Sequence, residues 1–233
     1  MNSTTARAGA DRDHVQIETA EMNAKQKFLT VTAVWIIISM ILSFIDLSYS
    51  LDSVASFIIV MLNRLLMLAV FIMLLVASPG ETCRAASLLK RPAKTGVAAY
   101  IVGIVGAIVR FHINLQEIIH ESVPEQAFAA VSGISALNLL YVVLCFFAYY
   151  RIGRRARKGS LLRISAIVAA WWPLVSYLTI TTVTITHLHQ FFFGGAGSFL
   201  LISSYISTII SHLSIALCVL ALRKELGSSR RED

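Results

Sequence analysis

Long apolar runs separated by short polar segments dominate the pattern along this chain. Six runs are each close to the ~20 residues with which an α-helix crosses a ~30 Å hydrocarbon layer. They cover Phe28–Ile45, Val54–Val76, Val97–Ile113, Ala127–Tyr150, Leu161–Ile185 and Ser198–Leu222. The runs are continuously apolar, whereas the strands of a membrane barrel show short segments of alternating polarity. The pattern therefore predicts an all-α membrane protein with six transmembrane helices.

The overall composition agrees with this prediction. Of the 233 residues, 57% are hydrophobic and only 14% are charged, whereas a soluble globular protein carries about 25% charged residues. Too little polar surface remains to cover a soluble fold. The pattern divides the chain into a disordered cytoplasmic tail over 1–27, a six-helix transmembrane domain over 28–222 and a second cytoplasmic tail over 223–233.

The positions of lysine and arginine predict the orientation of the chain. Apart from Arg64 and Arg110, these residues lie in the N-terminal tail, in the second and fourth loops and their edges, and in the C-terminal segment. The first, third and fifth loops contain none. Because cytoplasmic loops collect lysine and arginine, we predict that both termini are cytoplasmic and that the protein resides in a cytoplasmic (plasma) membrane.

The same distribution accounts for the formal net charge of +7. Basic loops at one membrane face are attracted to anionic lipid, so the charge requires no nucleic-acid partner, and none is predicted. The densest basic segment, YYRIGRRARKGSLLR over 149–163, suits contact with a cytoplasmic protein. The expected partners are therefore the lipid bilayer and a second protein or a second copy of the chain.

Arg64 interrupts the apolar run IIVMLNRLLMLAVF. It lies about 15 Å into the membrane at 1.5 Å per residue, which is near the midplane. A charge there costs about 2.5–3.5 kcal/mol on insertion scales and needs a partner, a water-filled cavity or a route to the interface. Asp46, at the end of the first span, suggests an ion pair with Arg64. Without that pair, Arg64 and the adjacent Asn63 would attract an anionic solute.

Arg110, in the third span, leaves two interpretations open. Its side chain can lean back towards the membrane centre and approach the same cavity as Arg64 and Asp46. The excess positive charge would then bind an anion or an acidic headgroup. Alternatively, Arg110 can bend to the outer interface beside His112, as long side chains do near helix ends.

Other spans contribute polar groups at comparable depth. Asn138 lies in the fourth span, Pro173 predicts a kink in the fifth, and His212 lies beside a stripe of serines in the sixth. Serines at helical spacing, like the Gly103–Ala107 pair, are first of all packing residues. Polar groups in several spans beside a helix break are also typical of substrate pathways. The candidate substrate-binding residues are Arg64, Asn63, Arg110, Asp46, Asn138 and His212.

The sequence carries no signature of an enzyme. It contains no GxSxG, HExxH, Walker loop or GxGxxG, so no catalytic residue is assigned and a non-enzymatic role is favoured. Histidine and carboxylate suit zinc, and the candidate ligands of an outer metal site are His120, Glu121, His187 and His189. The alternative explanation for His120 and Glu121 is that they belong to an amphipathic interfacial helix with a solvated acidic face. The sequence identifies no cofactor.

Two classes of function remain. The polar groups near the midplane favour a permease- or channel-like bundle, alone or as one subunit of a complex, that binds or moves a small anionic or amphiphilic solute. The alternative is a non-transporting membrane subunit or sensor that contacts a cytoplasmic partner through its basic loops. The short extramembrane segments and the lack of a binding motif favour this alternative.

Overall fold

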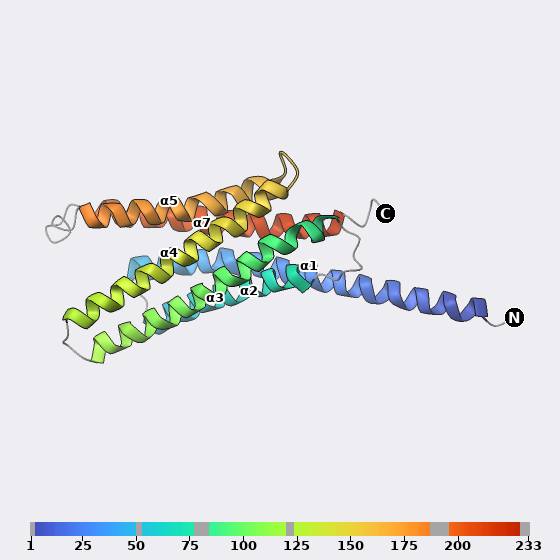
Figure 1. Cartoon of the computed structure of the whole chain (residues 1–233), viewed down its shortest axis with the longest axis horizontal. Coiled ribbons are helices and arrows are strands. Elements are labelled where there is room, and N and C mark those ends of the chain that lie inside the picture. Colours follow the sequence, from blue (N-terminus) through green and yellow to red (C-terminus); the bar gives the residue numbers. More distant parts are fainter. Residues whose placement is uncertain (1–2, 50–52, 77–83, 120–123, 187–195, 229–233) are drawn as a thin grey trace.

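The chain is all-helical over the residues that its structure, a computed structural model, describes. The backbone is described for 3–49, 53–76, 84–119, 124–186 and 196–228, and the side chains for 20–45, 54–76, 89–112, 135–182 and 202–225. Within these ranges lie α1 (Ser3–Tyr49), α2 (Ser53–Val76), α3 (Arg84–Ile119), α4 (Pro124–Arg155), α5 (Leu161–Thr186) and α7 (Ala196–Ser228) (Figure 1). Each of these six helices contains a segment long and apolar enough to cross a membrane. The prediction of an all-helical chain with six such segments is confirmed.

The helices extend beyond the apolar runs that predict them. The sequence places the start of the third span at Val97, but α3 already begins at Arg84, and α4 continues to Arg155. The hydrogen bonds of a helix join backbone groups, so the helix can continue where its side chains become polar. Pro92 and Pro173 also lie inside helices. Some of the basic residues that polarity assigns to loops therefore lie in the ends of helices.

The N-terminal segment is helical as well. Residues 3–27, for which the sequence predicts a disordered tail, form the first part of α1, and this helix extends beyond the other helices (Figure 1). The segment contains no proline, and it includes alanine, glutamate, glutamine and lysine, which have high helix propensity. Its polarity indicates contact with solvent, but its propensity favours a helix.

The six described helices form a ring in which neighbours in the sequence are neighbours in space. α2 packs on α3, α3 on α4, α4 on α5, and α5 on α7, and α7 packs on α1. The smallest contact in the ring is the one between α1 and α2. Because consecutive helices run in opposite directions, the starts of α1, α3 and α5 and the ends of α2, α4 and α7 lie at the same end of the bundle (Figure 1).

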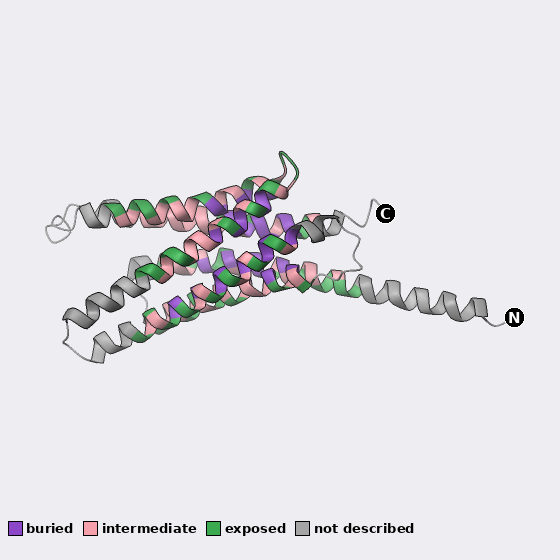
Figure 2. Ribbon diagram, viewed as in Figure 1, coloured by how far each residue is buried: buried purple, intermediate pink, exposed green. Residues whose placement is uncertain are grey.

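The core lies in the half of the bundle nearest that end, which we call the packed end. Buried apolar side chains from all parts of the ring lie there and include Leu29, Phe71, Tyr149, Leu162 and Val219. Figure 2 shows the buried positions concentrated in this half. Towards the opposite end the helices diverge (Figure 1), and the described side chains are mostly exposed or half-buried. Exposed apolar side chains such as Ile58 and Leu178 suit contact with lipid tails.

A small residue on α3 allows the core to pack closely. A Cβ on Gly96 would overlap with the ring of Phe71 from α2. The ring of Phe71 lies 5.6 Å from that of Tyr100 and 5.8 Å from that of Tyr149, measured between centroids. The hydroxyl oxygens of these two tyrosines are 2.8 Å apart and share a hydrogen bond. Aromatic packing and a buried hydrogen bond thus join α2, α3 and α4 at the packed end.

We predict that Gly96→Ala destabilises the bundle. The added methyl group meets the buried ring of Phe71, and overpacking of this kind costs about 1–3 kcal/mol. Gly106→Ala on the same helix is the matched control, because a Cβ there would meet Leu137 at an ordinary 3.6 Å. Thermal unfolding in detergent micelles should give a lower midpoint for Gly96→Ala than for Gly106→Ala. Equal midpoints would contradict the close contact.

Candidate functional site

Arg64 lies in the middle of α2 and contacts two neighbouring helices. Its Nη1 donates a hydrogen bond to the backbone carbonyl of Gly103 on α3. Its guanidinium carbon lies 4.9 Å from the ring centroid of Tyr141 on α4. A Cβ on Gly103 would lie 2.8 Å from Tyr141 Cδ2 and 3.5 Å from Arg64 Cδ, so the contact depends on the glycine. Arg64 therefore joins α2, α3 and α4.

Neither of these two partners of Arg64 carries a formal charge. A carbonyl attracts the guanidinium as a neutral hydrogen-bond acceptor, and an aromatic ring attracts it through its quadrupole. Among the described side chains, the acidic ones are Glu21 and Glu225. Both lie towards the packed end, and Glu21 is paired with Lys25 at 3.3 Å. Within the described part of the chain, therefore, no carboxylate neutralises Arg64.

Asp46 and Asn63 are the candidate residues that the sequence links most directly to Arg64, as its expected ion-pair partner and its neighbour in the chain. The side chain of Asp46 lies outside the described residues, so its ion pair with Arg64 stays a prediction. Asn63 has a buried Oδ1 that has no hydrogen-bond partner among the described residues. Leaving such an acceptor unsatisfied costs about 1–3 kcal/mol. This oxygen is therefore available to accept a hydrogen bond from water or from a ligand.

Asn138 lies near the contact between Arg64 and Tyr141. It is half-buried on α4, one helical turn before Tyr141. Its Oδ1 lies 3.9 Å from the position that a Cβ on Gly106 would occupy, and Gly106 lies one turn after Gly103. Asn138 therefore places an amide group beside α3, one turn from the contact between Tyr141 and Arg64. We call Arg64, Gly103, Asn138 and Tyr141 the Arg64 cluster.

Arg110 and His212 do not belong to the Arg64 cluster. Arg110 is exposed on α3, about two turns beyond Gly103, and the structure does not bring it into the Arg64 cluster. This placement favours the interpretation in which its side chain reaches the interface. His212 is half-buried on α7, and its Nδ1 donates a hydrogen bond of 2.8 Å to the carbonyl of Thr208 on the same helix. That nitrogen therefore carries the proton, because a carbonyl can only accept.

The candidate metal ligands are not placed by the structure. His120, Glu121, His187 and His189 lie outside the described residues. Within the described residues, no group of three or more histidine, cysteine, aspartate or glutamate side chains is arranged to hold a metal ion. The outer metal site therefore stays a hypothesis.

A second candidate site, which the sequence analysis did not identify, lies between α5 and α7. A cavity of about 230 Å³ there has a lining that includes Trp172, Ser176, Thr179 and Ser203. Trp172 Nε1 is buried and has no hydrogen-bond partner among the described residues. Hydroxyl groups and an indole N–H in a largely apolar cavity suit a small amphiphilic ligand. The helical spacing of Ser176 and Thr179 was visible in the sequence, but spacing within one helix does not show that the next helix leaves space.

Comparisons with protein-family models, with curated proteins and with solved structures find no match to this chain. The functional interpretation therefore rests on the geometry of its own residues.

We predict that Arg64 and Tyr141 are energetically coupled. Arg64→Met removes the guanidinium, and Tyr141→Leu removes the ring. If the two groups interact, the double variant should lose less stability than the sum of the single variants, by about 0.5–2 kcal/mol. Unfolding free energies of the four proteins in the same micelle measure this difference.

A second cycle provides the control for this measurement. Tyr177 on α5 donates its hydroxyl hydrogen bond to the carbonyl of Ser135 at 3.0 Å and does not belong to the Arg64 cluster. Arg64→Met and Tyr177→Leu should therefore be additive. If the losses of unfolding free energy for Arg64→Met and Tyr141→Leu are also additive, the contact between these residues contributes nothing to stability.

Proposed function

We propose that this protein is a permease- or channel-like helix bundle that binds or moves a small anionic or amphiphilic solute in a membrane. The observation that supports the proposal is the environment of Arg64. This cation lies in the middle of an apolar helix, and Gly103 and Tyr141 hold it through uncharged groups. Arginines within membrane spans are costly, and they often mark ion and substrate pathways. An anion at the Arg64 cluster would supply the opposite charge.

The groups around Arg64 suit this role. A guanidinium has five N–H donors in a planar fork that matches carboxylate and phosphate oxygens. The contacts with Gly103 and Tyr141 restrict the orientation of that plane, which reduces the entropy lost when an anion binds. Asn63 precedes Arg64 on α2 and Asn138 lies one turn before Tyr141 on α4, so both add amide groups at a similar level of the bundle. The cavity between α5 and α7 is a separate site, and its hydroxyl groups among apolar side chains suit an amphiphilic solute.

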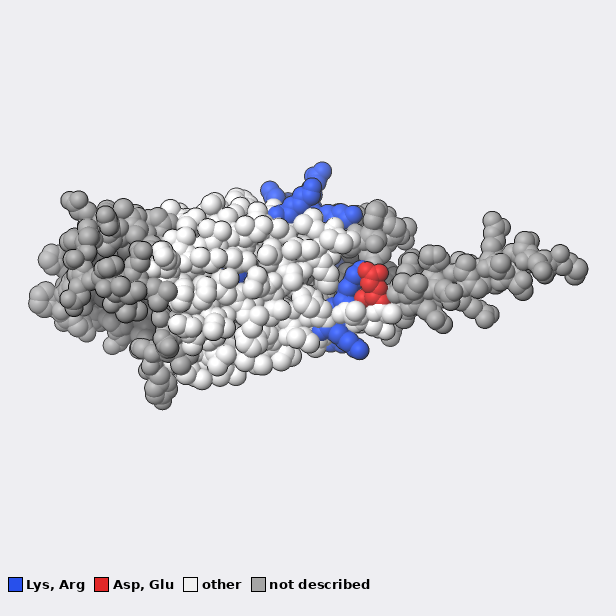
Figure 3. All heavy atoms as spheres, turned by 90° about the horizontal axis from the view of Figure 1, so that it is seen from below, with Lys and Arg blue, Asp and Glu red and all other residues white. Residues whose placement is uncertain are grey.

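The packed end is proposed to face the cytoplasm. Figure 3 shows lysine and arginine gathered towards one end of the molecule, beyond a surface that contains few charges. Because cytoplasmic segments are enriched in basic residues, this arrangement favours cytoplasmic termini and a cytoplasmic membrane. The residues concerned are Lys25, Lys27, Lys90, Arg91, Lys94, Arg151, Arg154, Arg155, Arg157, Lys158, Arg163, Arg223 and Lys224.

Cysteine labelling in cells tests this orientation. Cys145 and Cys218 are buried, and Cys83→Ser removes the remaining native cysteine. In that background, Ser122→Cys should react with a membrane-impermeant thiol reagent in intact cells. Lys158→Cys should react only after the membrane is permeabilised. The reverse pattern would overturn the proposed orientation.

Transport by proteoliposomes tests the proposed role of Arg64. We expect the wild-type protein to take up at least one of three anionic probes: inorganic phosphate, acetate and laurate. Arg64→Met should reduce that uptake by roughly tenfold or more, because a hydrogen bond to a charged group contributes about 1.5–3 kcal/mol. Arg64→Lys is the control that keeps the charge, and it should retain part of the uptake. Uptake at the wild-type rate by a folded Arg64→Met protein would contradict the proposal.

The gathering of basic side chains at the packed end favours a second candidate function. A non-transporting membrane subunit or sensor would use this surface to contact a cytoplasmic protein, and Arg64 would act in packing alone. The transport experiment separates the two functions. If the protein is a non-transporting subunit or sensor, the wild type moves none of the three probes, and a cytoplasmic protein copurifies with it in mild detergent.

A further inference from the structure

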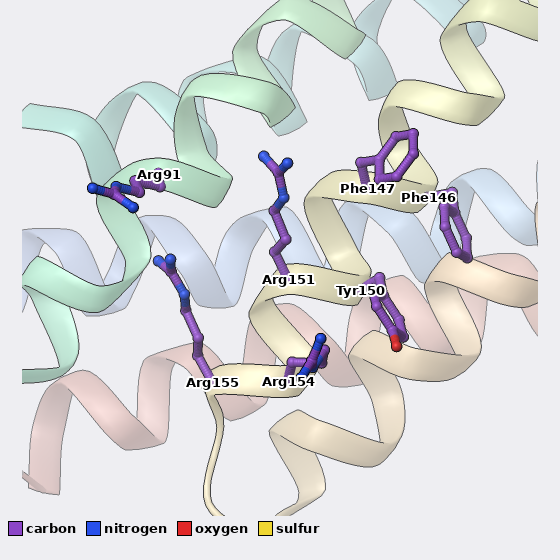
Figure 4. Close-up of a pocket in the computed structure, with 7 residues that line it drawn as sticks. All are labelled: Arg91, Phe146, Phe147, Tyr150, Arg151, Arg154 and Arg155. Carbon is purple, nitrogen blue, oxygen red and sulfur yellow. The ribbon is translucent and has the colours of Figure 1, made fainter.

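A groove at the packed end combines arginine with aromatic side chains. It has a volume of about 640 Å³, and the described residues of its lining are four arginines and three aromatic residues. Arg91 comes from the beginning of α3, and the other six residues come from the last turns of α4 (Figure 4). The groove is separate from the Arg64 cluster, because Arg151 lies about 15 Å along α4 from Tyr141 at 1.5 Å per residue.

Helical periodicity sorts the residues from α4 into two parallel stripes. Residues four apart lie on the same side of a helix. The first stripe consists of Phe147, Arg151 and Arg155, and the second consists of Phe146, Tyr150 and Arg154. Along each stripe, aromatic rings come first and arginine follows towards the packed end.

Contacts with neighbouring helices hold both stripes in place. In the first stripe, the guanidinium carbon of Arg151 lies 5.9 Å from the ring centroid of Phe147. Its Nη1 donates a hydrogen bond of 3.2 Å to Thr95 Oγ1 on α3. Figure 4 shows Arg151 and Arg155 extending from α4 in the same direction. The groove therefore has a cationic wall on the side of α3, in which Thr95 and Phe147 restrict Arg151.

The second stripe faces α5. The guanidinium carbon of Arg154 lies 6.0 Å from the ring centroid of Tyr150. Tyr150 stacks on Phe146 at 5.4 Å, and Phe146 meets Trp171 of α5 edge-on at 4.9 Å. A continuous row of rings thus leads from the apolar part of the bundle to Arg154.

Among the residues that the structure describes, the charged groups lining the groove are four arginines, and none is acidic. An anion that binds there would therefore meet charges of the opposite sign. Planar guanidinium groups recognise phosphate oxygens in pairs. The groove therefore matches a phosphate group in charge and in geometry.

The position of the groove indicates where that phosphate comes from. The apolar segments of α3 and α4 begin at Leu89 and end at Arg155, respectively, so the arginines lie at the edge of the span. The side chain of Phe147 is 44% exposed, on the stripe that leads towards the apolar part of the span. Aromatic residues are typical of the zone between lipid tails and headgroups. A free phosphate would contact only the arginines, whereas a lipid would also cover the rings.

We propose that this groove binds an anionic phospholipid, with its phosphate between the arginines and the first part of its acyl chains on the aromatic rings. The site requires neither transport by the bundle nor an anion at Arg64. It also differs from general attraction to an acidic membrane, because it assigns binding to particular arginines within the basic segment.

Native mass spectrometry of the full-length protein in a neutral detergent tests this site. The three probes are dioctanoyl phosphatidylglycerol, dioctanoyl phosphatidylcholine and glycerol phosphate. We expect the anionic lipid to bind more tightly than either of the other two. Arg151→Gln with Arg154→Gln should weaken its binding by roughly 25-fold, because each basic residue near an anionic surface contributes about 1 kcal/mol, or about fivefold.

A matched double variant separates the groove from diffuse charge. Arg157→Gln with Lys158→Gln removes the same charge from two exposed residues outside the groove, and it should leave the affinity within about twofold of the wild type, well short of the fivefold effect of one contacting cation. Arg154→Gln alone, which keeps the bond between Arg151 and Thr95, should still weaken binding by about fivefold. Each variant is compared only if its helix content and elution volume match the wild type.

Several outcomes would overturn the proposal. Equal losses in the two double variants would mean that the basic segment attracts anions without a defined site. Equal affinities for glycerol phosphate and the anionic lipid would identify a phosphate site that ignores the lipid chains. Equal affinities for the two lipids would show that charge is not recognised. If the wild type binds none of the probes, the groove is not a lipid site, and contact with a protein partner becomes the favoured role of this surface.

Discussion

The close approach of α2 and α4 to glycine positions on α3 is the constraint on which the bundle depends. Gly96 leaves room for the ring of Phe71, and Gly103 exposes its carbonyl to Arg64. Apolar side chains gain little by leaving lipid for protein, so close packing and internal hydrogen bonds must hold membrane helices together. A larger residue at Gly96 would separate α2 from α3 and would disturb the aromatic core. The same separation would pull Arg64 away from Gly103, so the core and the candidate site share one geometric requirement.

The sequence predicts the helices well because their main signal is local. The length and continuity of each apolar run indicate a membrane-spanning helix, and a segment of this kind is present in all six described helices. The ends of the helices are harder to predict, because polarity marks the edge of an apolar layer and not the end of backbone hydrogen bonding. Lys90 and Arg91 illustrate the difference, since both are polar and both lie within α3.

The candidate site is only partly predictable, because its contacts join distant parts of the chain. The pattern identifies Arg64 as unusual, but it cannot show that Gly103 and Tyr141 become its partners, since periodicity gives the face of a helix and not the neighbour of that face. For the same reason, the pattern cannot show that Arg110 is exposed on α3, about two turns beyond Gly103. The groove at the end of α4 is a different case. The sequence shows the spacing of Tyr150 and Arg154 on one helix, but it does not show that Arg91 of α3 completes the groove.

The concentration of the core at the packed end has a mechanical consequence. The helices pack tightly at one end, around Phe71 and Tyr149, and diverge at the other. A change in the tilt of a helix at the packed end is therefore amplified along its length. If the helix is about 30 Å long, a tilt of about 5° at the packed end moves its opposite end by roughly 2.5 Å. Small rearrangements among the packed rings would therefore displace the opposite ends of the helices by about the diameter of a water molecule.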